Sequence, residues 1–222
     1  DIAAAFIKAR LDRMGLKGAG PGGAFFQPFD LMSASLGMDN RLEAAFSGGP
    51  VMHFRHGQGF YPLRFSASGL ARGPIVFAGF GIRPADYGPT VKGQIVLVLD
   101  HEPGEFDPRS PFDGLVRSEA SSPLRKALLA QDKGAVGILF VRDVHNHPGP
   151  FDFESSAAEY WPDGGAPSDW RGLAEWVDKL YIPAAQVSPS VAEALVRSSG
   201  RAFHDLSKAS ETPNGMTPVL LT

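Results

Sequence analysis

The sequence predicts an α/β fold, with a mixed β-sheet, flanking helices and long loops. Continuous apolar runs at residues 75–80, 94–99 and 135–141 have the composition of strands that are buried on both faces. Between the second and third runs, the stretch from Ser122 to Gly134 carries the start and stop signals of a helix. Because strand, helix and strand in this order form a βαβ unit, part of the sheet should be parallel.

The chain begins with a predicted amphipathic helix over residues 1–16. Gly15 ends this helix, and Leu16 is placed to contact Leu11, as in a Schellman C-cap. Apolar side chains recur at helical spacing and form one face, which contains Phe6 beside a stripe of Ala3, Ile7, Leu11 and Met14. Because this face needs a partner, we expect it to pack on another domain or, in the isolated chain, to support self-association.

Other elements are less sharply marked. Pro28 indicates an edge strand or an extended segment at residues 25–32. Residues 39–70 predict short strands separated by glycine-containing turns. Further along, residues 181–187 predict a strand, and a helix should run from Ser188-Pro189 to Gly200.

The connection at residues 142–180 is too long for an ordinary loop and contains all three tryptophans. Aromatic side chains stand there among acidic ones, and the candidate contact residues are Tyr160, Trp161, Trp170 and Trp176. Large rings supply contact area at low entropic cost, which suits a recognition surface. The same rings could equally cover the sheet or a helix locally.

Composition excludes several classes of function. A net charge of -3 supplies no basic field for nucleic acid. No window is long and apolar enough to predict a membrane span. The absence of cysteine excludes disulfides, thiol nucleophiles and cysteine-ligated zinc. No Gly-x-Ser-x-Gly elbow is present, and Gly79-Phe80-Gly81 lacks the third glycine of a dinucleotide loop because Pro84 takes its place.

Potential metal ligands follow the second and third predicted strands. They are His101, Glu102 and Asp107 in one loop, and His145 and His147 in the next. If the strand ends meet at one sheet edge, these side chains could bind a divalent cation. Two histidines at i and i+2 point in opposite directions in an extended chain, which weakens a joint role for His145 and His147. Salt bridges and Asx turns that stabilise loops are the more common use of such residues.

Four segments carry a family resemblance, in order along the chain, at residues 76–82, 86–87, 91–98 and 133–141, and weaker ones lie at 101–103, 146–147 and 182–188. Together they resemble the protease-associated (PA) domain inserted in bacterial di-zinc aminopeptidases. The resemblance covers about residues 70–200. Residues 3–29 are also similar to the helix and Phe/Gln/Pro run that precede the insertion in that family.

The resemblance implies a division into an N-terminal helix and extended segment at 1–36, a PA domain at 37–200 and an exit segment at 201–222. It further implies that the first helix packs on a peptidase domain of the same polypeptide. In the family that domain binds two zinc ions through motifs C-terminal to the insertion, and the chain stops about where they would begin. We therefore expect no catalytic residue and no cofactor in this chain.

The function implied is that of a lid or substrate-access module of a zinc-dependent aminopeptidase, with peptides as substrates. A secreted or periplasmic location goes with that function. The alternative is a free-standing PA module that binds peptides or proteins without hydrolysing them.

Overall fold

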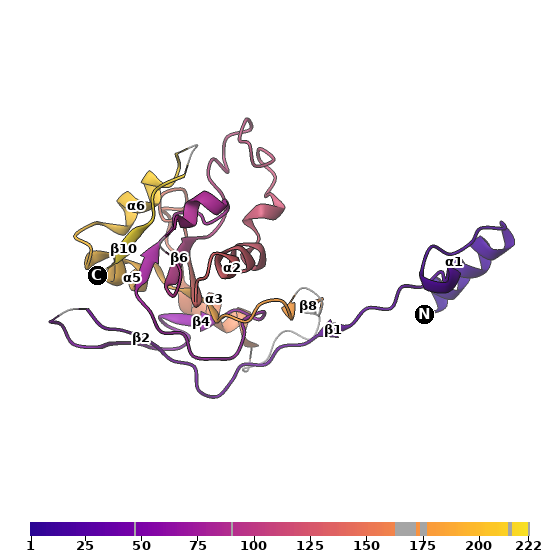
Figure 1. Ribbon diagram of the computed structural model, residues 1–222, viewed down its shortest axis with the longest axis horizontal. Coiled ribbons are helices and arrows are strands. Elements are labelled where there is room, and N and C mark those ends of the chain that lie inside the picture. The colour runs from indigo at the N-terminus through magenta and orange to yellow at the C-terminus, as the bar shows by residue number, and fades with distance from the viewer. Residues whose placement is uncertain (47, 90, 163–171, 174–176, 213–214, 222) are drawn as a thin grey trace.

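The computed structural model is centred on one six-stranded mixed sheet (Figure 1). It describes residues 1–46, 48–89, 91–162, 172–173, 177–212 and 215–221. The strand order is β10-β5-β6-β7-β9-β4. The strands are β4 (Phe60–Pro62), β5 (Ile75–Phe77), β6 (Ile95–Leu99), β7 (Gly137–Val141), β9 (Ala184–Val187) and β10 (Val219–Leu221).

The four central strands are parallel, and the two outer ones are antiparallel to their neighbours. The α/β prediction is therefore confirmed, including its βαβ unit, since β6 and β7 pair in parallel with Val96 opposite Ile138. The strand predicted at 75–80 ends at Phe77, because Gly79 and Gly81 both take positive φ and turn the chain.

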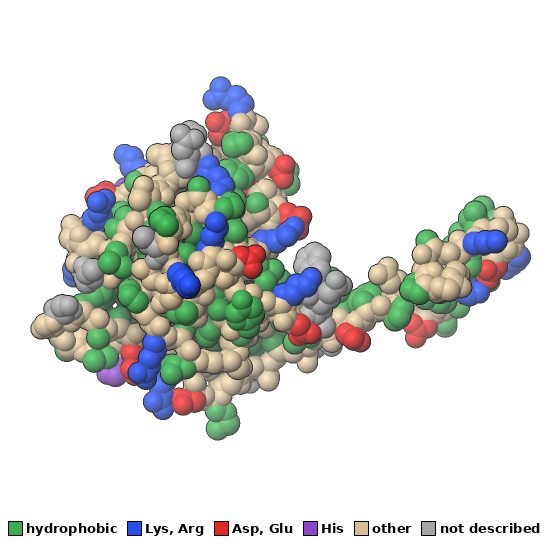
Figure 2. All heavy atoms as spheres, viewed as in Figure 1, with side chains coloured by type: hydrophobic (Ala, Val, Ile, Leu, Met, Phe, Trp, Pro, Cys, Tyr) green, Lys and Arg blue, Asp and Glu red, His purple; other side chains and the backbone are tan. Residues whose placement is uncertain are grey.

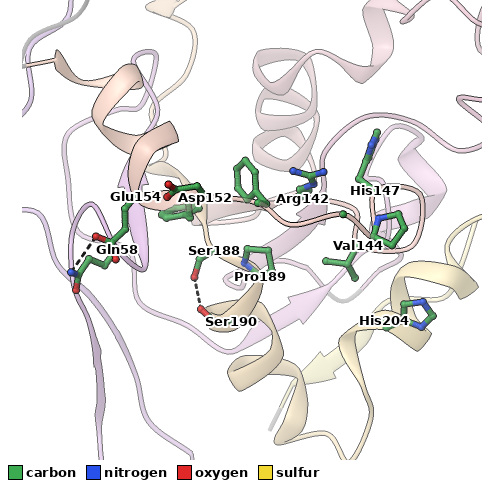
Figure 3. Close-up of a pocket in the computed structure, with 14 residues that line it drawn as sticks. Gln58, Arg142, Val144, His147, Asp152, Glu154, Ser188, Pro189, Ser190 and His204 are labelled. Carbon is green, nitrogen blue, oxygen red and sulfur yellow. Dashed lines mark hydrogen bonds between the residues drawn. The ribbon is translucent and has the colours of Figure 1, made fainter.

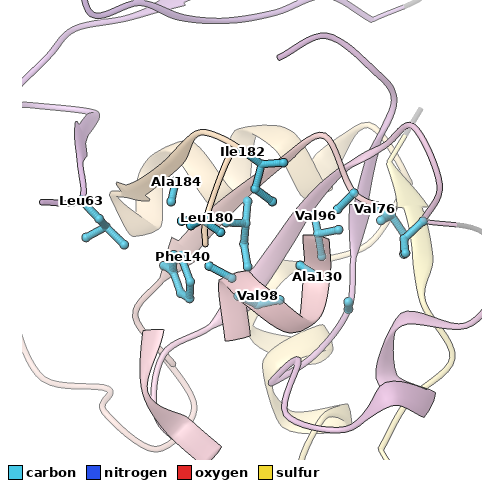
Figure 4. Packing of buried hydrophobic residues seen from close by; sticks show 14 of the residues in the cluster. Leu63, Val76, Val96, Val98, Ala130, Phe140, Leu180, Ile182 and Ala184 are labelled. Atoms are coloured by element: carbon cyan, nitrogen blue, oxygen red, sulfur yellow. The ribbon is translucent and has the colours of Figure 1, made fainter. Parts of the chain in front are cut away.

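Helices cover both faces of the sheet. One face packs against α2 (Pro123–Asp132) and α3 (Phe153–Tyr160), and the other against α5 (Pro189–Arg197) and α6 (Phe203–Ala209). Each face of the sheet carries its own hydrophobic core, and the side chains of strand β6 point alternately into one core and the other. Val96 and Val98 belong to the first core, which Figure 4 shows, and Leu97 and Leu99 to the second.

The second core extends past residue 200. Phe203 and Leu206 of α6 and Leu221 of β10 are all buried in it. Strand β10 pairs with β5 and so forms one edge of the sheet. Residues beyond 200 therefore contribute to the same core and sheet.

The N-terminal helix α1 (Ile2–Arg13) lies away from the sheet at the end of an extended arm (Figure 1). Its C-terminus has the predicted Schellman geometry, since Gly15 has φ 73° and the Leu16 amide donates to the Leu11 carbonyl. None of its residues is buried.

Smaller elements complete the described chain. Two short pairings are antiparallel, β1 (Leu31–Met32) with β8 (Gly172–Leu173) and β2 (Leu42–Ala44) with β3 (Met52–Phe54). Three 3₁₀ turns are η1 (Pro21–Gly23), η2 (Pro84–Tyr87) and η3 (Glu119–Ser121). No helix in these described parts has the length and apolar character needed to cross a bilayer.

Gly81, in the turn after β5, is expected to be sensitive to substitution. It has φ 61°, and a Cβ there would lie 2.7 Å from both the Tyr87 hydroxyl and Val98 Cγ1. Gly93 has a similar φ of 74° but open space around the Cβ position. Gly93→Ala should therefore report backbone strain alone, at about 1 kcal/mol, and Gly81→Ala should cost at least about 1 kcal/mol more. Urea unfolding of both variants checks this, and equal losses would contradict the clash.

Candidate functional site

Three ligand-type side chains meet at the carboxyl edge of the parallel strands. His101 lies two residues after β6, Glu105 follows in the same loop, and His147 lies six residues after β7. His101 Nδ1 is 2.6 Å from one Glu105 oxygen, and His147 Nε2 is 2.8 Å from the other. The two ring nitrogens are 3.3 Å apart. Within the described ranges, this is the one His/Asp/Glu cluster compact enough to hold a metal ion.

The cluster is only partly open to solvent. The Glu105 side chain is 13% exposed and those of His147 and His101 are 24% and 32% exposed. The Phe106 ring lies 5.7 Å from the His147 ring, edge to face. A small ligand could therefore reach the two imidazoles, while the carboxylate is mostly shielded.

A buried lysine holds the backbone at His101. Lys126 of α2 is 1% exposed, and its ammonium nitrogen donates to the carbonyls of Leu99, at 2.8 Å, and His101, at 2.6 Å. His101 itself has φ 66°, an uncommon conformation for a residue other than glycine. Burial lowers the pKa of Lys126 to about 7, against the opposing effect of the Asp100 carboxylate.

One carboxylate ties the two loops together. Glu211, just after α6, accepts a hydrogen bond from the Gly104 amide at 2.8 Å. It also accepts one from the Asn146 side-chain amide. The residues next to Glu105 and His147 are thus attached to the same side chain, which fixes the spacing between the two ligand-bearing loops.

The loop after β7 has its own internal anchor. Asp143 is fully buried and accepts from the His145 amide at 2.9 Å and from the Ser207 hydroxyl. The His147 amide donates to the Asp143 carbonyl at 3.1 Å. These bonds turn the chain so that His147 faces His101.

The structure separates the other predicted ligands from this cluster. Glu102 is 2% exposed and accepts from the Ser118 amide and hydroxyl. Asp107 is bound to Arg109, whose amide and guanidinium hold the pKa of its carboxyl below the usual value. His145 turns instead toward His204 on α6, at 5.6 Å between ring centres.

Glu105 was not among the predicted candidates, although it lies between Glu102 and Asp107. The direction of its side chain depends on the turn at Gly104, which has φ 68°. The loop carries four acidic residues close together, Asp100, Glu102, Glu105 and Asp107, and nothing in their spacing shows which one faces a neighbouring strand's loop.

A cleft of about 650 Å³ begins beside this cluster. Figure 3 shows Gln58 and Glu154 at one end and His147 and His204 at the other. Arg142 and the residues at the start of α5, Ser188 to Ser190, lie along it. Both polar and apolar groups are therefore available to a bound segment.

The described aromatic residues of the long connection pack locally. Trp161 is 7% exposed and donates from its indole nitrogen to the Pro62 carbonyl at 2.8 Å. The Tyr160 hydroxyl accepts from the Arg64 amide at 3.0 Å, and the Arg64 guanidinium lies 4.0 Å from the tyrosine ring centre. Burial raises the pKa of Tyr160. Trp170 and Trp176 lie outside the described residues.

The fold and its loops define an α/β domain with polar side chains gathered at the carboxyl ends of its parallel strands. The chain belongs to the PA domain family, whose pattern matches residues 71–195. This range runs from the segment before β5 into α5 and includes both ligand-bearing loops. A search of curated proteins found no match to the chain.

Proposed function

We propose that this chain is the PA module of a larger zinc-dependent aminopeptidase, located outside the cytoplasm. A peptidase domain of the same polypeptide would hold two zinc ions and hydrolyse peptides, and the PA domain would cover its cleft and limit access. Membership of the PA family supports an association with a peptidase. The exposed face of α1 is the observation that carries the proposal.

Helix α1 and its C-cap residue Met14 present exposed apolar side chains. Phe6 and Ile7 are 56% and 57% exposed, and Met14 is 72% exposed. Figure 2 shows hydrophobic side chains on the surface of this helix, separated from the body by the arm. Several exposed apolar side chains on one helix are characteristic of a contact with another protein surface. A domain of the same polypeptide suits it, because the arm keeps that surface close at all concentrations.

The reading frame beyond residue 222 gives the first test. We expect a peptidase domain with His, Asp and Glu zinc ligands within about one domain length. A frame that ends there, or one that enters an unrelated domain, would overturn the proposal. The isolated chain with added zinc should release no product from amino-acid anilides, and measurable release would also contradict it.

The contact through α1 is tested by one charge substitution in two settings. In the full polypeptide, Ile7→Glu should lower stability by about 2 kcal/mol, because it would bury an unpaired charge between domains. In the isolated chain the same change should have almost no effect, because Ile7 is exposed there. Ala9→Glu is the control, since it adds the same charge on the opposite face of the helix.

Denaturant unfolding of both variants and of the unmodified protein, in each of the two settings, measures these changes. If Ile7→Glu and Ala9→Glu lower the stability of the full polypeptide equally, this face of α1 is not the contact surface. Light scattering of the isolated chain, with and without Ile7→Glu, shows whether the helix instead pairs with a second copy.

The cleft beside α5 favours a second candidate, a free-standing module that binds peptide segments. Its lining includes Arg142, Gln58 and the Ser190 hydroxyl, which can bind backbone or carboxylate groups. Fluorescence anisotropy with a random library of short labelled peptides tests it. Binding that weakens in Arg142→Ala, together with a reading frame that ends at residue 222, would favour this candidate.

A further inference from the structure

We propose that His101, Glu105 and His147 bind one zinc ion, with a water molecule as the fourth ligand. This site would belong to the PA domain itself and is separate from any metal centre of a peptidase domain. It depends only on the geometry of these side chains and does not rest on the proposed function.

The spacing of the two imidazole nitrogens fits a tetrahedral zinc ion. Zinc–nitrogen bonds of about 2.0–2.1 Å at the tetrahedral angle place two ligand nitrogens about 3.3–3.4 Å apart. His101 Nδ1 and His147 Nε2 are 3.3 Å apart. Glu105 has one oxygen 2.6 Å from the His101 nitrogen and the other 2.8 Å from the His147 nitrogen, so the three side chains face one another. These distances are shorter than the spacing of about 3.3 Å around a tetrahedral zinc ion, so the Glu105 carboxylate would move back by about 0.5 Å when the ion binds.

Protons alone satisfy this arrangement poorly. His101 Nδ1 lies within hydrogen-bond distance of both Glu105 Oε2, at 2.6 Å, and His147 Nε2, at 3.3 Å. A ring nitrogen carries either one hydrogen or one lone pair, so it can serve only one of these contacts. Glu105 Oε1 is buried and has no hydrogen bond of regular geometry, although His147 Nε2 is 2.8 Å away. A divalent cation would accept lone pairs from all three groups at once.

The surrounding residues hold the ligands in place, as the outer shell of a metal site does. His101 keeps an uncommon positive φ, and Lys126 binds its carbonyl. Glu211 joins the loop of Glu105 to that of His147 through Gly104 and Asn146. Strained backbone that is fixed from several sides is typical of functional sites.

The donor set selects the class of ion. Two imidazoles and one carboxylate suit zinc, whereas calcium and magnesium prefer sites made of oxygen ligands. With three protein ligands, the fourth position is left for water. Partial exposure of both histidines gives that water access from solvent.

Calorimetric titration of the chelator-treated chain with zinc chloride tests the proposal. We expect one zinc ion per chain and an increase in melting temperature on binding. Glu105→Gln and His147→Ala should each weaken binding at least tenfold. His145→Ala is the matched control. It removes a histidine that lies in the same loop as His147 but faces His204, so this variant should bind zinc like the unmodified chain.

Two further measurements separate a defined site from general weak binding. Cobalt(II) substitution should give the strong visible absorption of a four-coordinate ion, which Glu105→Gln should reduce, and calcium should give no heat. Circular dichroism before titration shows that each variant is folded, and the isosteric Glu105→Gln keeps the test valid if His147→Ala does not fold. No heat with zinc, or equal binding by Glu105→Gln and the unmodified chain, would overturn the proposal.

Discussion

Replacing Phe140 with alanine is expected to lower the free energy of unfolding by about 3–5 kcal/mol. Phe140 lies in β7, one of the two middle strands of the sheet, is fully buried, and pairs in register with Val98 on one side and Gln186 on the other. The central position leaves little room for the sheet and helices to collapse into the cavity. Small domains have a total stability of about 5–15 kcal/mol, so this single change would remove a large share.

Phe29→Ala is the matched control for this prediction. The same ring is removed, but Phe29 is 67% exposed in the N-terminal arm, so its loss should change stability by less than about 0.5 kcal/mol. Urea unfolding followed by circular dichroism gives both values. A loss below about 1 kcal/mol in Phe140→Ala would mean that the sheet is not the cooperative core of this domain.

The central sheet could be predicted from the sequence because its signals are local. Strands β5, β6 and β7 are continuous apolar runs, and the start of α2 is marked by Ser122-Pro123. The α5 helix likewise begins after Ser188, whose hydroxyl accepts from the Val191 amide as an N-cap. These elements are specified by their own composition and by capping residues only a few positions away in the sequence.

The sheet edges could not be predicted in the same way. Strand β10 is three residues long and exists through its pairing with β5, about 140 residues earlier. Strand β4 lies in the stretch at 39–70 where short strands were expected, but its place at the sheet edge comes from its antiparallel pairing with β9. Such short strands are defined by distant partners, which the local pattern does not contain.

The candidate site could likewise be predicted only in part from the sequence. The sequence indicated that the loops of His101 and His147 could meet at one sheet edge. They do, because β6 and β7 are neighbouring parallel strands and their carboxyl ends lie at the same edge. The choice of Glu105 over Glu102 depends on a turn at Gly104 and on the Ser118 amide, which binds Glu102. The first is a backbone conformation and the second is a contact across 16 residues, so the spacing of the acidic residues does not encode either of them.

Lys126 is expected to make the stability of this domain rise with pH above neutrality. Burial lowers its pKa in the folded protein from 10.5 to about 7, and the carboxylates of Asp100, Glu102 and Asp86 and the Arg117 guanidinium also act on it. Between about pH 7 and 10 the unfolded chain therefore holds a proton that the folded chain releases. Because the unfolded state binds more protons, the free energy of unfolding increases with pH, by up to about 1.4 kcal/mol per pH unit.

Lys126→Met should remove this increase, and the exposed Lys133→Met at the end of the same helix should keep it. Urea unfolding at about pH 7.5, 8.5 and 9.5, in chelator so that no bound ion contributes, measures the slopes. The range stops there because burial raises the pKa of Tyr61 and Tyr87, so that ionisation of tyrosine in the unfolded chain lowers stability at higher pH. Equal slopes in the two variants would mean that Lys126 stays charged when folded, with its two carbonyl contacts and nearby carboxylates outweighing the cost of burial.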